Sequence, residues 1–130
     1  MPLSHSRNLL TATSIFGTIF IAGGLNAIFR PGPALEFFDL NAAAAVSDQS
    51  LVDTLMLVYG VRDIFIGPAM YSAAYSGDRK HWGLIVLAGG GVAFVDGLAC
   101  WLYVGKGEWN HWGYPPLVAG VGAVLLGVLD

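Results

Sequence analysis

Four long apolar stretches constrain the fold of this chain more than any other feature of its sequence. Crossing the hydrocarbon core of a membrane takes about 20 helical residues, and each stretch approaches or exceeds that length. The stretches run from about Asn8 to Phe29, Leu51 to Tyr75, Trp82 to Val104 and Tyr114 to Leu129. We therefore expect an all-α fold, an integral membrane four-helix bundle, with residues 1–130 forming a single transmembrane domain.

The composition agrees with a membrane protein and excludes several classes of function. Hydrophobic residues make up 55% of the chain and charged residues only 12%, whereas charged residues are about a quarter of a typical soluble domain. The net charge of -3, without a basic run, argues against a nucleic-acid partner. The single Cys100 cannot form an internal disulfide or a CxxC redox pair, and three scattered histidines add no convincing ligand set. We expect no metal and no cofactor.

The segments between the spans set the expected orientation. Residues 34–46 are too short and too mixed in polarity to cross a membrane, so we expect them to lie on its surface. A small excess of positive charge on one side predicts multi-pass topology with both termini in the cytoplasm. The basic residues are Arg7, Arg79 and Lys80 on that side, against Arg30 and Lys106 on the other.

Small residues recur at helical spacing within the spans. Membrane helices associate through close approach of such residues, because lipid tails remove the usual gain from burying apolar side chains. Gly60 and Gly67 share one face of the second span. The third and fourth spans carry similar ridges, made of Gly89, Ala93 and Gly97 and of Ala119, Ala123 and Gly127.

Three charged residues lie where a membrane helix should be apolar. Arg62 and Asp63 fall near the middle of the second span, and Asp96 lies well inside the third. A charge at the bilayer centre costs at least ~2.5 to 3.5 kcal/mol on insertion scales, so such residues face the protein interior and are candidates for function. Asp63 shares the glycine face of its helix, which places it inward, and the longer Arg62 can reach Asp96. The sequence leaves open which aspartate Arg62 pairs with.

Other polar side chains lie within one or two helical turns of these charges or at the ends of the spans. Tyr59 is one turn from Asp63, and Cys100 is one turn beyond Asp96. We take Arg62, Asp63 and Asp96 as candidate catalytic residues. The candidate substrate-binding residues are Tyr59, Asn26, Cys100, Tyr103 and His111. The alternative for His111 is an interfacial anchor between two tryptophans.

The segment from Tyr59 to Gly67, followed by a short basic turn and an apolar helix carrying Asp96, resembles a recurring pattern. It is similar to small four-helix integral membrane proteins of fungi and bacteria that form a family of unknown function. Arg30 stands here where that family usually has an asparagine before proline. The resemblance implies four transmembrane helices and, for some fungal members, a role in secondary-metabolite biosynthesis, with the endoplasmic reticulum as the membrane in a fungal cell.

These residues favour an acid/base enzyme. Two carboxylates in a dry cavity cannot both ionise cheaply, so one keeps a proton while an arginine stabilises the other, which supplies an acid and a base together. By analogy with chemistry on other folds, the trio suits an epoxide hydrolase, and a cyclase or isomerase would use the same groups. The expected partners are a lipophilic small molecule, membrane lipid and a second copy of the chain in a homodimer.

Three alternatives compete with the enzyme. In the first alternative, Arg62 only forms an ion pair with one of the two aspartates, and this pair fixes which helices meet. The second is a non-catalytic scaffold that holds biosynthetic enzymes at the membrane, although its short loops offer little docking surface. The third is a small proton-coupled carrier, in which one aspartate changes protonation as the substrate moves.

Overall fold

The computed structural model describes residues 2–40 and 49–130, and the regular structure of these two ranges is helical throughout. The all-α fold is thereby confirmed. The elements in chain order are the 3-10 helix η1 (Leu3–His5), α1 (Arg7–Phe29), α2 (Pro31–Glu36), α4 (Gln49–Tyr75), α5 (Arg79–Ala99), the π-helical turn η2 (Cys100–Val104), α6 (Glu108–Trp112) and α7 (Pro115–Leu125).

Local side-chain chemistry marks where several helices begin. The hydroxyl of Ser6 accepts a hydrogen bond from the backbone N–H of Asn8 at 3.3 Å, at the start of α1. The carboxylate of Asp78 accepts one from the backbone N–H of His81 at 3.1 Å, at the start of α5. Both contacts satisfy donors that the first turn of a helix leaves free. Pro115 occupies the first turn of α7, where a backbone N–H is not needed.

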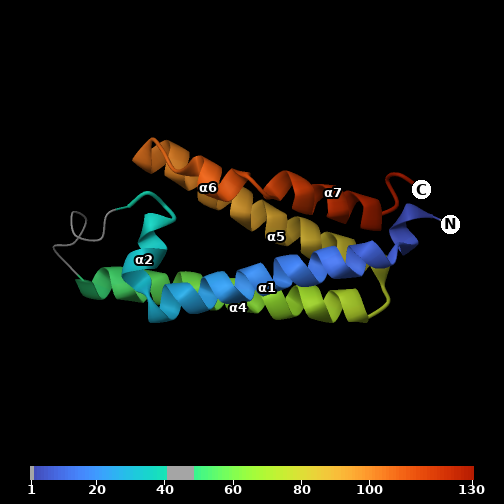
Figure 1. Cartoon of the computed structure of the whole chain (residues 1–130), viewed down its shortest axis with the longest axis horizontal. Helices are drawn as coiled ribbons and strands as arrows, with labels where there is room; N and C mark the ends of the chain where they lie inside the picture. Colours follow the sequence, from blue (N-terminus) through green and yellow to red (C-terminus); the bar gives the residue numbers. More distant parts are fainter. Residues whose placement is uncertain (1, 41–48) are drawn as a thin grey trace.

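The helices form two layers that run side by side (Figure 1). In one layer α1 packs along α4, and in the other α5 packs against α6 and α7. The short helices α6 and α7 follow one another along α5, while α2 stands at the end of the bundle away from the termini (Figure 1). Between the layers, most of the contact is made by α4 and α5.

Glycines bring the backbones of α1 and α4 into direct contact. A Cβ atom added at Gly24 would lie 2.5 Å from the carbonyl oxygen of Gly60, and one added at Gly60 would lie 2.6 Å from that of Gly24. Gly17 and Gly67 face each other in the same way, two turns along the pair. The packing role predicted for Gly60 and Gly67 is confirmed.

The ridge predicted on the third span is also a packing face. Gly89 lies directly under the side chain of Met70 from α4, Ala93 is fully buried, and Gly97 lies under the indole of Trp112 from α6. One side of α5 therefore contacts both layers through residues too small to hold the helices apart.

The ridge predicted on the fourth span is not the contact face of α7. The helix meets α5 at Gly122 instead, where an added Cβ would lie 3.2 Å from the carbonyl oxygen of Gly83. Ala119 is exposed, and Gly127 lies beyond the helix end with a φ of 83°. The true face is turned from the expected ridge of Ala119, Ala123 and Gly127 by one residue, which is about 100° on a helix.

Within residues 2–40 and 49–130, two of the four expected spans have the length and apolar character to cross a membrane. They are Arg7–Phe29 and Arg79–Val104, the latter being α5 continued through η2. Helix α4 has 27 residues, but Arg62 and Asp63 lower its hydropathy. The expected fourth span is shorter than predicted, because α7 has only 11 residues and is preceded by the separate helix α6.

The surface segment expected at residues 34–46 is described only in part. Its first residues end helix α2, and a turn follows as far as Leu40. Ala34 and Leu35 are buried against Ala27 and Met56, so this part of the segment packs on α1 and α4. Residues 41–46 lie outside the described part of the chain.

Candidate functional site

Helices α4 and α5 bring Arg62, Asp63 and Asp96 together at the junction of the two layers. The Arg62 guanidinium donates to both carboxylate oxygens of Asp96, from Nη1 to Oδ1 at 2.9 Å and from Nη2 to Oδ2 at 2.8 Å. It also donates to Oδ1 of Asp63, from Nε at 3.0 Å and from Nη2 at 2.9 Å. The sequence left open whether Arg62 pairs with Asp63 or with Asp96, and in the structure it pairs with both.

The three charges differ in their access to the surroundings. The side chain of Asp63 is 6% exposed and that of Asp96 12%, whereas that of Arg62 is 36% exposed. The cluster thus opens outward at the guanidinium and is closed at the carboxylates. With two acidic groups and one basic group, it carries one negative charge in excess when both carboxylates are ionised.

Aromatic rings cover the cluster. The guanidinium carbon of Arg62 lies 4.5 Å from the ring centre of Tyr59, one turn back along α4. Phe38, which follows α2, packs edge-on against Tyr59 with ring centres 5.2 Å apart. Phe38 also contacts the ring of His111 from α6 at 4.6 Å. A continuous series of rings therefore links Arg62 to the short helix α6.

An open cavity of about 410 Å³ lies beside the cluster, at the end of the bundle where α2 stands. Its lining comes from α1, α2, α4 and α6, and comprises Gly23, Asn26, Pro33, Ala34, Glu36, Phe37, Tyr59 and Asn110. Tyr59 belongs both to this lining and to the aromatic cover of Arg62. Oδ2 of Asp63 lies 3.7 Å from where a Cβ of Gly23 would stand. Tyr59 and Gly23 thus connect the cavity to the charged cluster.

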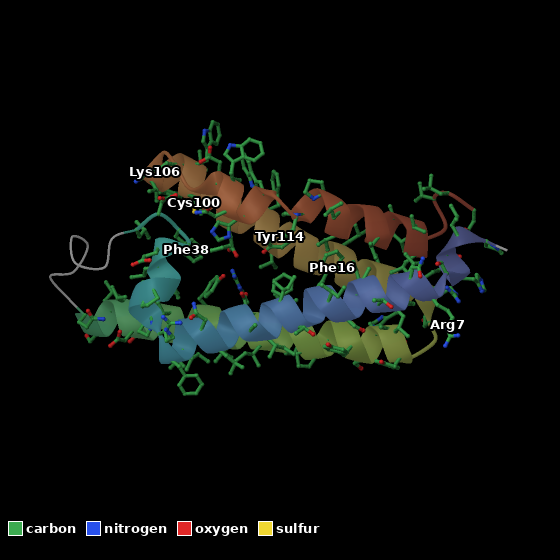
Figure 2. The ribbon with its side chains drawn as sticks, viewed as in Figure 1. Arg7, Phe16, Phe38, Cys100, Lys106 and Tyr114 are labelled. Atoms are coloured by element: carbon green, nitrogen blue, oxygen red, sulfur yellow. The ribbon has the colours of Figure 1, made fainter. Side chains whose placement is uncertain are left out.

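Polar contacts hold the turn after α2 against α6 and η2. The amide of Asn110 donates to the carbonyl oxygen of Phe37 at 3.0 Å and to Oδ2 of Asp39 at 3.4 Å. The thiol of Cys100 donates to the carbonyl oxygen of Phe38 at 3.9 Å. Side by side in Figure 2, Phe38 and Cys100 lie between α2 and the end of the α5 layer. These contacts fix Phe38 in its position over Tyr59.

His111 is almost completely enclosed, with 1% of its surface exposed. Its ring packs on Phe37 and Phe38, and its Nε2 atom is buried with no hydrogen-bond partner among the described residues. His111 is therefore an enclosed polar side chain between α6 and the turn that follows α2.

The structure brings most of the candidate residues to one end of the bundle. Arg62, Asp63 and Asp96 are in direct contact, with Tyr59, Asn26, Cys100 and His111 arranged around them or around the cavity. Tyr103 is separate from this group, because η2 turns its side chain outward to 86% exposure.

Phe38 and Asn110 were not among the residues selected from the sequence. Asn110 is next to His111 in a polar and aromatic run, which is a weak signal for a role at the site. Phe38 gives no such signal, because its position over Tyr59 depends on the chain returning from α2 to α6.

Comparison with known proteins places the chain among relatives whose role is itself undefined. The family model described as a domain of unknown function, DUF4267, matches residues 17–125, a range that includes the charged cluster and every residue of the cavity lining. No curated protein and no solved structure matches the chain. Since the family model covers most of its length, the chain belongs to the DUF4267 family.

Proposed function

We propose that this protein is a cofactor-independent acid/base enzyme of the epoxide hydrolase, cyclase or isomerase type, acting on a lipophilic substrate. One observation carries the proposal: two enclosed carboxylates share a single guanidinium beside an open cavity of about 410 Å³. Asp63 and Asp96 are the acid and base, and Arg62 is the cation that orients them. In fungal relatives the substrate would be a secondary metabolite.

The charge balance supports a divided role for the two aspartates. One guanidinium cannot neutralise two enclosed carboxylates, so the cluster favours a state in which one carboxyl keeps a proton. Both oxygens of Asp96 accept a hydrogen bond from Arg62, which is the arrangement that best stabilises an ionised carboxylate. Asp63 uses only Oδ1 for Arg62, and its Oδ2 lies 3.7 Å from where a Cβ of Gly23, a residue of the cavity lining, would stand. We therefore assign the proton to Asp63.

Epoxide opening illustrates the chemistry. Asp96 accepts a proton from a water molecule while the water oxygen forms a bond to one epoxide carbon. The bond between that carbon and the epoxide oxygen breaks, and Asp63 gives its proton to this oxygen, so that epoxide and water become a diol. A proton then returns from Asp96 to Asp63 and restores the cluster. Cyclisation or isomerisation would use the same acid and base without consuming water.

The proposed setting is a multi-pass membrane protein with four crossings. Helices α1 and α5 have the length and hydropathy of membrane spans. Helix α4 crosses with its charges turned toward Asp96, and α6 and α7 together make the return crossing along α5. Both ends of the described chain lie at the same end of the bundle, where Ser4 hydrogen-bonds to Asp130, which supports an even number of crossings (Figure 1). We propose that this end faces the cytoplasm.

The test is untargeted metabolite profiling of cells with the gene deleted and then complemented. The wild-type protein should clear a lipophilic compound that accumulates on deletion. Asp63→Asn and Asp96→Asn should each fail to clear it, because neither amide can act as acid or base at neutral pH. Asp53→Asn is the matched control, since Asp53 is an exposed carboxylate on the same helix as Asp63.

The amount and thermal stability of each variant in the membrane fraction must be measured alongside the metabolites. Loss of clearance in a variant that reaches the membrane at wild-type level supports the enzyme. Normal clearance by both Asp→Asn variants would contradict it and would favour a scaffold, whose pathway activity survives any change that still folds.

A further inference from the structure

The residues that line the cavity beside the cluster favour an uncharged ligand group over a charged one. We propose, resting on the enzyme function above, that it binds the polar end of the substrate and that this end is an uncharged amide or hydroxyl group. Carboxylates, phosphates and amines should bind there less well. Three features of the cavity support this: the state of its nearest cation, the side-chain amides of Asn26 and Asn110 in its wall, and the aromatic rings of the same lining.

The nearest cation is not available to an anionic substrate. Arg62 uses four of its N–H donors on Asp63 and Asp96, and a guanidinium has only five. With two carboxylates on one guanidinium, the cluster behind Tyr59 is neutral or negative. An incoming carboxylate would therefore lose its hydration without gaining a cationic partner, which is unfavourable.

A cationic substrate finds little compensation either. Glu36 is the one carboxylate in the lining, and its side chain is exposed at the rim, where water screens its charge. Asp39, close by, already contacts Lys106 at 3.7 Å. Of the two enclosed carboxyl groups, Asp96 has both oxygens on Arg62, and Asp63, to which the proton is assigned, has Oδ1 on Arg62. An amine would have to leave water without an enclosed counter-ion.

Uncharged hydrogen-bonding groups fit the wall of the cavity. The side-chain amide of Asn26 makes no hydrogen bond to any residue in the described ranges, so its donors and its acceptor are free. The side-chain nitrogen of Asn110 donates hydrogen bonds to the carbonyl oxygen of Phe37 and to Oδ2 of Asp39. The side-chain oxygen of Asn110 remains as an acceptor. An amide or hydroxyl can donate to Asn110 and exchange hydrogen bonds with Asn26. Asn26 is half-buried and Asn110 is exposed, so these hydrogen bonds would replace those that water makes to the two amides.

The apolar part of the ligand has its own surfaces. The rings of Phe37 and Tyr59 belong to the same lining, with Phe37 47% exposed. A polar group held between Asn26 and Asn110 would have its carbon skeleton against these rings and near the acid/base pair. The cavity thereby orients a neutral amphiphile by its polar end.

The experiment measures binding of radiolabelled dodecanamide to the full chain in lipid nanodiscs. Empty nanodiscs correct for partition of the probe into lipid. Unlabelled dodecanamide, dodecanoate and dodecylamine are compared as competitors, because they share a chain and differ in charge. We expect dodecanamide to compete at least tenfold better than either charged compound. Asn26→Leu should weaken probe binding about tenfold, since it removes both hydrogen bonds of the amide.

Asn8→Leu is the matched control, because Asn8 is an exposed asparagine on the same helix and far from the cavity, and it should bind like the wild type. Equal competition by dodecanoate or dodecylamine, or unchanged binding in Asn26→Leu, would overturn the proposal. Asp63→Asn separates it from the proposed function. If this variant still binds dodecanamide and still clears the cellular metabolite, the enzyme proposal fails while the inference about the cavity stands.

Discussion

The helix contacts within each layer differ in kind from those between the layers. Within a layer, glycines allow backbone to approach backbone, as at Gly24 and Gly60 or at Gly83 and Gly122. Between the layers, side chains make the contact. Arg62 bridges to Asp96, and the indole of Trp82 donates to the hydroxyl of Thr13 at 2.9 Å, fully buried.

Aromatic side chains fill the rest of the space between the layers. Phe16 from α1 and Tyr114 from the start of α7 lie there together, packed against Phe20 and Met70 (Figure 2). The difference shows where the fold has room for chemistry. Contacts between backbones leave no space for a substrate, whereas an interface built from long side chains can open into a cavity at one end.

The largest effect on stability is expected from Arg62→Met. This change removes the cation from two enclosed carboxylates, and breaking a buried ion pair from one side costs about 3 kcal/mol. Unfolding of the purified protein in detergent at neutral pH would measure it. Arg79→Met is the control, because Arg79 lies at the start of α5, away from the cluster. A loss no larger than that of the control would show that the bridge does not hold the layers together.

The next largest effect is expected within a layer, from Gly60→Ala. The new methyl group would stand 2.6 Å from the carbonyl oxygen of Gly24, so the helices must separate, at a cost of about 2 kcal/mol in unfolding free energy. Gly120→Ala is the matched control, because in the described part of the chain no atom outside the neighbouring backbone of its own helix lies within 4 Å of the added Cβ. It should lose nothing and gain a few tenths of a kcal/mol from its better helix propensity. Equal unfolding free energies for the two variants would contradict the close backbone contact between α1 and α4.

The smallest effect is expected at the rim of the site. Lys106 contacts Asp39 at 3.7 Å, but the two side chains are 68% and 38% exposed. Exposed ion pairs contribute little, so Lys106→Ala should change the unfolding free energy by less than about 0.5 kcal/mol. The same unfolding assay measures it. A loss of more than about 1 kcal/mol in unfolding free energy would show that the contact between Lys106 and Asp39 stabilises the fold more than an exposed ion pair does.

Features that depend on one helix alone could be predicted from the sequence. The expected span from Leu51 to Tyr75 agrees with α4, which runs Gln49–Tyr75, because hydrophobic content and a polar turn define such a helix locally. The inward position of Asp63 followed from the glycines on its face, and it is 4% exposed. The proximity of Arg62 and Asp96 followed from the high cost of burying a charge that has no partner.

Features that depend on how helices turn toward one another could not be predicted. Ala119 belongs to the small-residue ridge expected on the fourth span and Gly122 does not, and only the rotation of α7 on α5 makes Gly122 the contact. The double pairing of Arg62 needs the position of α5 along α4. The placement of Phe38 and Asn110 needs residues far apart in the chain to meet, which no local pattern encodes.

The central claim is that the two aspartates act chemically and do more than join α4 to α5. The most direct measurement is the amount of the accumulated metabolite in cells that carry the exchange Arg62→Asp with Asp96→Arg, which keeps opposite charges across the interface. We predict that thermal stability in membranes recovers well above that of Arg62→Asp alone, while the metabolite stays uncleared, because the acid and base no longer stand where the substrate needs them. Restored clearance by the exchanged pair would contradict the claim and reduce the cluster to an ion pair that fixes the helices.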